Sequence, residues 1–214
     1  MFEHSVLLRR EPSWRPPGKP FVPVSAPRSW LGEPRSLTAR LRAGCRDGFN
    51  VVVLRQAWRK PFAGEAARLG AGRRRMLVRE VMLRDGLTPL VLARTVIPPD
   101  SLRGPHCALA RLGNRPLGEV LFARRGLRRC SLECCRLGSA AWLPSIAGLC
   151  GIRQEVWGRR SVYRVGDARL LVAEFFLPAA LQLESVAGRI AAPGLPEAAG
   201  VAESACRRVA GVPA

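Results

Sequence analysis

Five stretches of the chain are dense in valine, leucine, isoleucine, methionine or phenylalanine and have the length of β-strands. They are residues 49–58, 75–84, 88–97, 161–165 and 169–176. An Asp85-Gly86 step separates the second stretch from the third, and Gly166-Asp167 separates the last two, so each pair predicts a β-hairpin. Hairpins in succession are typical of an antiparallel sheet, and few helices are available to cover it. The predicted fold class is therefore α+β.

The helical patterns are short. Ser36 can cap a helix that runs to Arg46, in which Leu37 lies on the apolar face. Residues 100–113 predict a helical crossover after the third strand, and residues 118–123 predict a short strand or a turn. The sequence contains no internal repeat, so these elements are expected to form one domain.

The length of 214 residues suits one domain with one hydrophobic core. Six prolines among arginines predict that residues 1–30 form a poorly ordered lead-in. Residues 191–214 are rich in alanine, glycine and proline, which predicts a flexible C-terminal tail. The folded domain is therefore expected to span residues 31–190.

The chain carries a formal net charge of +19. Clustered positive charge is typical of proteins that bind nucleic acid. Here only Lys19 and Lys60 are lysines, the arginines occur in every segment, and no nucleic-acid motif accompanies them. We therefore expect no nucleic-acid partner, although such a charge also attracts small anions over a long range.

The cysteines do not predict disulfides or a metal site. They number seven, show no paired spacing and follow no secretory signal, so reduced thiols in the cytoplasm are expected. Cys130, Cys134 and Cys135 lie close together, but they lack a C-x-x-C pair and the chain has only two histidines. The longest uncharged run, residues 138–152, is shorter than the roughly 20 apolar residues of a membrane span. We expect no metal and no integral membrane segment.

Three charged residues stand inside predicted strands, where side chains alternate between the two faces of the sheet. Arg79 shares a face with leucine and valine, Arg94 falls among leucine and valine, and Glu174 has apolar neighbours on either face. Buried charges are costly unless they pair or bind something. The three side chains could form an internal ion-pair network, or they could line an apolar pocket that binds a small anion. Strand periodicity alone leaves both open.

The same residues carry a resemblance to a known family. The chain resembles the chorismate-pyruvate lyases of ubiquinone biosynthesis in six stretches that occur in the family's order between about residues 35 and 180. The stretches are Arg35-Ser-Leu-Thr-Ala-Arg-Leu41, Leu77-Val-Arg-Glu-Val-Met-Leu83, Ala93-Arg-Thr-Val-Ile-Pro98, Leu112-Gly-Asn-Arg-Pro-Leu-Gly118, Trp157-Gly-Arg-Arg-Ser161 and Leu171-Val-Ala-Glu-Phe-Phe-Leu-Pro178. The segment from residue 122 to 157 is longer than the family pattern.

The resemblance implies an antiparallel six-stranded sheet whose peripheral helices enclose a buried ligand pocket. Arg79 takes the place of the arginine that binds the ligand carboxylate, and Glu174 that of the glutamate near the ring hydroxyl. Leu117 and Leu37 correspond to residues that line the pocket, and Arg94 also matches a family arginine that is a candidate for substrate binding. Arg79 and Glu174 are the implied catalytic residues.

The activity implied by the resemblance is cleavage of chorismate into 4-hydroxybenzoate and pyruvate, the first committed step of ubiquinone biosynthesis, by a cytoplasmic monomer without a cofactor. The alternative is a non-catalytic sensor of aromatic acids, because effector domains of some bacterial transcription regulators share this fold. Such regulators carry a winged helix-turn-helix, for which the proline-rich start leaves no room. A basic nucleic-acid-binding protein is the third possibility.

Overall fold

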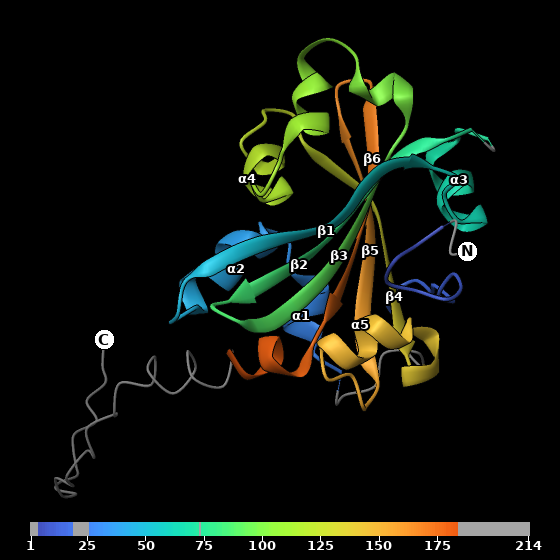
Figure 1. The fold of residues 1–214 in the computed structure, drawn as a ribbon. Coiled ribbons are helices and arrows are strands. Elements are labelled where there is room, and N and C mark those ends of the chain that lie inside the picture. Colours follow the sequence, from blue (N-terminus) through green and yellow to red (C-terminus); the bar gives the residue numbers. More distant parts are fainter. Residues whose placement is uncertain (1–3, 19–25, 73, 184–214) are drawn as a thin grey trace, which may run out of the picture.

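The computed structural model describes residues 4–18, 26–72 and 74–183, and these contain a six-stranded antiparallel sheet in the order β1-β2-β3-β6-β5-β4 (Figure 1). The strands are β1 (Phe49–Arg59), β2 (Met76–Asp85), β3 (Thr88–Ile97), β4 (Arg128–Leu137), β5 (Val156–Val165) and β6 (Ala168–Phe176). The α-helices are α1 (Arg28–Gly32), α2 (Leu37–Gly44), α3 (Ala63–Leu69), α4 (Leu117–Phe122) and α5 (Pro144–Leu149), and the 3-10 helices are η1 (Pro99–Leu102), η2 (Gly104–Arg111) and η3 (Ser139–Ala141). The α+β fold class and the antiparallel six-stranded sheet are confirmed.

Both predicted hairpins are present. β2 pairs with β3 and β5 pairs with β6, each through a tight turn. Gly86 and Gly166 take positive φ angles of 52° and 55° in these turns, a backbone conformation that a residue without a Cβ adopts readily. The fifth strand begins at Val156, earlier than the residue 161 that its pattern suggested.

Three elements differ from the sequence-based expectation. Strand β4 was not predicted, because the arginines and the glutamate in it interrupt the apolar pattern. Residues 118–123 form helix α4 rather than a strand or turn, since Leu117 and Leu121 share a helical face. Residues 100–113 form two 3-10 helices instead of one helix, because Gly104, with a φ of 54°, and the proline after it interrupt the turn.

Elements of different kinds cover the two faces of the sheet (Figure 1). Helices α1, α2 and α4 lie on one side, which we call the site face. Helices α3 and α5 lie on the other side, the back face, together with residues 4–18. Side chains that alternate along each strand therefore enter separate hydrophobic clusters on the two faces, and adjacent residues of a strand have different neighbours.

Residues 4–18, which composition placed in a poorly ordered lead-in, pack against the back face. Leu7 is fully buried and Leu8 is 3% exposed. Arg15 forms an antiparallel bridge with Cys134 of β4, and the Ser5 hydroxyl donates to the buried carboxylate of Glu80. A few apolar side chains set among the prolines and arginines thus supply the buried contacts that overall composition conceals.

The long segment after β4 also packs on the back face. It contains η3 and α5, and Trp142 and Ile146 are buried in the cluster that holds Leu7. Because this segment lies across the sheet from α2 and α4, its extra length does not intrude on the site face. No helix among the described residues is long and apolar enough to cross a membrane.

The boundaries of the predicted domain stay predictions. The tail expected at residues 191–214 lies outside the described residues, as does the end of the expected domain at residue 190.

We predict that Leu7→Ala lowers the free energy of unfolding by about 2–5 kcal/mol, because it leaves a cavity in a packed cluster. Urea denaturation followed by tryptophan fluorescence measures the change. Leu87→Ala is the matched control, since Leu87 is 86% exposed in the β2-β3 turn and its truncation leaves stability unchanged. Equal stability of the two variants would show that residues 4–18 do not belong to the core.

Candidate active site

The site face holds a cavity between the sheet and helices α2 and α4. The space inside it that the centre of a water-sized sphere can occupy is about 50 Å³. Its apolar lining comes from Leu37, Val51, Val81, Ala93, Leu117, Leu121 and Val172. Its polar lining comes from Thr38, Arg79, Thr95, Tyr163 and Glu174. Mostly apolar walls with a few polar groups suit a small aromatic or cyclic ligand that carries charge at its ends.

Arg79 enters this cavity from the middle of β2, opposite Thr95 of β3. Its side chain is 2% exposed, and one terminal nitrogen donates to the carbonyl oxygens of Gly113 and Arg115 at 2.7 and 3.2 Å. Its Nε is buried without a hydrogen-bond partner, and no carboxylate of the described residues forms an ion pair with it. Burial lowers the pKa of Arg79 because it disfavours the charged form. A bound anion would supply the missing partner.

Glu174 enters the same cavity from β6, opposite Ala93 of β3 and Arg159 of β5. Its carboxylate accepts a hydrogen bond from Arg159 Nε at 2.5 Å. The Arg159 guanidinium also donates to the carbonyl oxygens of Trp30 and Glu33, so both ends of the pair are fixed. Burial by itself lowers the pKa of Arg159, but the Glu174 carboxylate outweighs burial and the net shift is upward. Arg159 therefore stays charged beside Glu174.

Arg79 and Glu174 face one cavity without neutralising each other. Strand β3 lies between their two strands, and its Thr95 and Ala93 line the space separating them. The sequence left open an internal ion-pair network or an apolar pocket. Among the described residues, Arg79 and Glu174 do not form an ion pair with each other. The arrangement is a cation at one end of an apolar cavity and a carboxylate at the other.

Leu37 and Leu117 stand at the starts of the two covering helices and line the cavity, as the motifs implied. Ser36 caps α2, because its hydroxyl accepts from the amide of Ala39 at 3.3 Å. Gly118 allows the helices to approach, since a Cβ there would lie 2.6 Å from the Thr38 hydroxyl.

Arg94 is not part of this cavity. It lies directly opposite Glu80 in the β2-β3 register, and since Glu80 is adjacent to Arg79, Arg94 belongs to the back face. Its guanidinium binds both carboxylate oxygens of Glu65 at 2.7 and 2.9 Å and one of Glu80 at 2.8 Å, and it donates to the carbonyl of His4. Burial lowers the pKa of Arg94, but the two carboxylates outweigh burial and the net shift is upward. All three guanidinium nitrogens donate to groups of the protein, so the geometry does not support the expected role in substrate binding.

Arg159 and Tyr163 belong to the site but were given no role from the sequence. Both point to the site face from β5, and the stretch Trp157-Gly-Arg-Arg-Ser161 already contained the signal for the first. Two consecutive arginines in a strand must face opposite sides, so one of them had to enter the cavity side. The other, Arg160, binds Glu133 on the back face at 2.8 and 3.0 Å.

The buried cysteines do not offer thiolate chemistry. Cys134 and Cys135 are fully buried in β4, and burial raises the pKa of the Cys134 thiol to about 11 and raises that of Cys135 still further. Both thiols are therefore protonated at neutral pH, and a thiol must lose its proton to act as a nucleophile or metal ligand. Within the described ranges, no three histidine, cysteine, aspartate or glutamate side chains are placed to hold a metal ion.

Comparison with known proteins gives a consistent match. The chorismate lyase family model matches residues 8–186. A probable chorismate pyruvate-lyase of Methylococcus capsulatus is 50% identical over 157 residues, which cover 72% of this chain and 96% of the relative. Proteins of the same description from Azoarcus and Aromatoleum aromaticum are 42% and 40% identical, over 73% and 79% of this chain and 86% and 92% of their own lengths. Among solved structures, the C-terminal domain of PhnF superposes with a TM-score of 0.49 and 14% identity, over 67% of this chain and 89% of that one. The family match spans every strand of the sheet and both helices of the cavity.

We predict that Arg94→Met destabilises the fold by about 3–5 kcal/mol, because it leaves the Glu65 carboxylate buried without its cation and Glu80 with Arg55 alone. Chemical denaturation measures the loss. Arg103→Met is the control, since Arg103 pairs with Asp100 at the surface with its side chain 80% exposed. A stability loss no larger than that of the control would contradict the structural role of Arg94.

Proposed function

Since the chain belongs to the chorismate lyase family, we propose that it cleaves chorismate into 4-hydroxybenzoate and pyruvate in the cavity between the sheet and helices α2 and α4. This activity would be the first committed step of ubiquinone biosynthesis. One observation carries the assignment of the cavity: Arg79 is buried in an apolar site without a carboxylate partner among the described residues. Such an arginine is suited to bind the carboxylate of a small aromatic acid.

Arg79 binds the ring carboxylate. Its outer nitrogen is held by the carbonyls of Gly113 and Arg115, which orient the guanidinium, while Nε makes no hydrogen bond to the described residues. An apolar cavity strengthens the attraction between the guanidinium and a carboxylate, because the effective dielectric constant is low there. The substrate is thereby anchored at one end of its ring.

Glu174 accepts a hydrogen bond from the ring hydroxyl, which lies at the opposite end of the ring from the carboxylate. Arg159 fixes the Glu174 carboxylate and keeps it beside a positive charge. The flat ring then lies between the two groups, along walls that include Val81, Ala93 and Val172. Shape and charge together select a ring with a carboxylate and a para oxygen.

The reaction needs positioning more than reactive groups. The ether bond between the ring and the enolpyruvyl oxygen breaks, and the hydrogen on the hydroxyl-bearing ring carbon passes to the enolpyruvyl methylene, which becomes the methyl group of pyruvate. The ring becomes aromatic, and atoms and electrons balance without an oxidant or reductant. The cavity contributes by holding the conformer in which that hydrogen and the methylene are close, and by placing fixed charges where charge develops.

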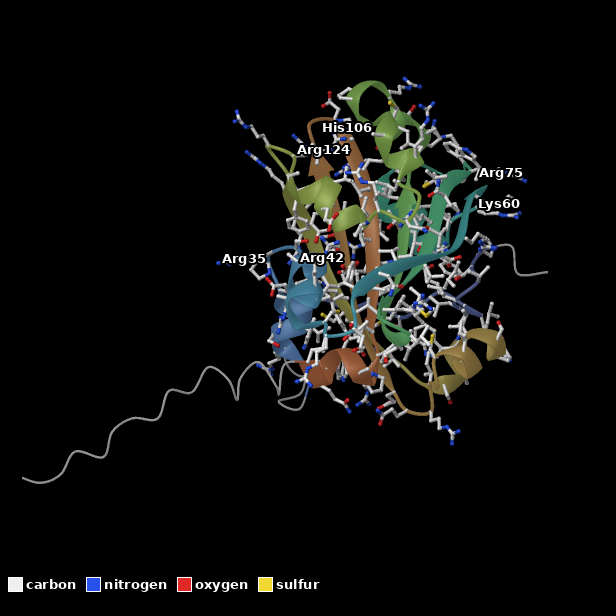
Figure 2. All side chains as sticks on the ribbon, turned by 60° about the vertical axis from the view of Figure 1, so that its left-hand side comes forward. Arg35, Arg42, Lys60, Arg75, His106 and Arg124 are labelled. Atoms are coloured by element: carbon white, nitrogen blue, oxygen red, sulfur yellow. The ribbon has the colours of Figure 1, made fainter. Side chains whose placement is uncertain are left out.

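The further expectations for the chain stay predictions: a cytoplasmic monomer that uses no cofactor and binds no nucleic acid. Figure 2 shows basic residues on separate parts of the molecule, with Arg35 and Arg42 beside helix α2, Lys60 and Arg75 across the sheet, and Arg124 next to His106. Basic residues spread in this way would attract a dianionic substrate from several directions.

We predict that the purified chain forms 4-hydroxybenzoate from chorismate without an added cofactor, and that Arg79→Met lowers kcat/KM about a hundredfold, the usual order for loss of a buried charged contact. Ultraviolet absorbance of the aromatic product measures the rate. Because Arg79 has no carboxylate partner among the described residues, its replacement leaves no buried carboxylate unpaired. The free energy of unfolding should therefore change by no more than about 1 kcal/mol.

Arg94→Met is the reciprocal control for this experiment: it should lose stability and, while folded, keep its activity. If the wild type binds the aromatic acid but forms no product from chorismate, the chain is a sensor rather than an enzyme. Unfolding of Arg79→Met would contradict the ligand-binding role of that arginine.

We predict that Glu174→Gln weakens the binding of 4-hydroxybenzoate about tenfold, because a neutral amide replaces a charged acceptor of the ring hydroxyl. Benzoate, which lacks that hydroxyl, should bind both forms equally. Quenching of tryptophan fluorescence measures both affinities. Glu155→Gln serves as the control because the Glu155 side chain is 55% exposed and forms a surface ion pair with Arg136 of β4. Equal weakening of the two ligands would contradict a contact between Glu174 and the hydroxyl.

A further inference from the structure

Chorismate has a second carboxylate, on its enolpyruvyl group, and neither Arg79 nor Glu174 accounts for it. The enolpyruvyl ether is attached to the ring carbon next to the hydroxyl-bearing one, so this carboxylate belongs near Glu174. The expected candidate, Arg94, lies on the back face, where its guanidinium binds Glu65 and Glu80. The inference that follows rests on the proposed function and assigns this remaining carboxylate to named residues.

A second cation, partly buried, lies beside the Glu174–Arg159 pair. Arg129, on β4, donates to the carbonyl oxygen of Glu33 at 2.6 Å, and Arg159 donates to the same oxygen at 2.9 Å. Two guanidinium groups thus meet at one backbone oxygen. Glu174 neutralises Arg159, whereas Arg129 forms no ion pair with any carboxylate of the described residues. The Glu33 side chain does not neutralise it either, because that carboxylate binds Arg40.

Tyr163 connects this cation to the cavity. Its hydroxyl oxygen accepts from two nitrogens of Arg129 at 3.1 and 3.3 Å, and its ring lies under α4 against Phe122, with centroids 6.0 Å apart. The residue is 4% exposed and lines the cavity that holds Glu174. Both Arg129 contacts use the oxygen as an acceptor, and its hydrogen donates to none of the described residues. Arg129 contacts both the Tyr163 hydroxyl and the Glu33 carbonyl oxygen that Arg159 contacts, so the hydroxyl lies toward the Glu174–Arg159 pair.

We propose that Tyr163 and Arg129 form the subsite for the enolpyruvyl carboxylate of chorismate. The Tyr163 hydroxyl donates its free hydrogen to the carboxylate, and Arg129 behind it supplies the positive charge that makes the hydroxyl a stronger donor. Arg159 forms an ion pair with Glu174, so it holds the Glu174 carboxylate in place rather than binding the substrate carboxylate. The cavity therefore has two anion positions, one at Arg79 and one at Tyr163.

The proposal predicts different effects on the substrate and on the product. Chorismate has the enolpyruvyl carboxylate and 4-hydroxybenzoate does not, so a change at this subsite should affect one ligand and leave the other alone. A residue that only supports the fold of the cavity would affect both. Arg79 and Glu174 contact groups that the two ligands share, which makes their variants a comparison set with the opposite behaviour.

The test measures kcat/KM for chorismate and the Kd of 4-hydroxybenzoate for Tyr163→Phe and Arg129→Met. Tyr163→Phe removes only the hydroxyl and keeps the ring against Phe122. We expect kcat/KM to fall about tenfold in each variant, as for loss of one charge-assisted hydrogen bond, while the Kd of 4-hydroxybenzoate stays within about twofold. Arg128→Met is the matched control, because it removes the exposed neighbouring charge of the same strand, and both quantities should stay unchanged.

Two results would overturn the proposal: unchanged kcat/KM in both variants, or equal loss of chorismate turnover and 4-hydroxybenzoate binding. Failure of the proposed function is a different outcome, because then the wild type itself would release no 4-hydroxybenzoate. That result would also contradict the proposed subsite. Should one variant fail to fold in a denaturation check, the other still decides, since they remove different halves of the same contact.

Discussion

A negative partner stabilises a buried arginine. Two buried arginines on adjacent strands of this sheet differ in whether the described residues supply that partner. Arg94 is surrounded by the carboxylates of Glu65 and Glu80, so its charge is balanced within the protein. Arg79 is equally inaccessible and receives only carbonyl oxygens from the described residues. Removing a charge from water is costly in both cases. The protein balances the first charge within its fold, whereas the second has no carboxylate partner among the described residues.

The two roles are kept apart by the alternation of side chains along each strand. Neighbouring charged residues point to different faces, as Arg79 and Glu80 do on β2 and as Arg159 and Arg160 do on β5. On the back face, charges pair with one another and with residues 4–18 and α3. On the site face, charges line or support the cavity. The sheet thus serves as a partition, with a structural ionic network on one side and a binding site on the other.

Stability and activity should therefore respond to different residues of the same strands. The back face combines ion pairs with the packing of Leu7 and Trp142, and loss of any member leaves a cavity or an unpaired charge. The site face retains open space and a cation without a carboxylate partner among the described residues, an arrangement that sacrifices some stability for binding. Since the long segment after β4 packs on the back face, it reinforces the structural side and leaves the mouth of the cavity to α2 and α4.

Alternating apolar positions and two glycine-containing turns were enough to predict the antiparallel sheet, because strand periodicity is a local property. The charges at Arg79 and Glu174 were compatible with an ion-pair network or with a pocket, and the family resemblance favoured the pocket. Strand β4 was missed because an edge strand rich in arginine lacks the apolar pattern. The partner of each charge could not be predicted, since it depends on strand register and on which helices cover which face. That is why the back-face position of Arg94 and the contacts of Tyr163 became visible only in the structure, whereas consecutive arginines at 159 and 160 already indicated that one of them faces the cavity side.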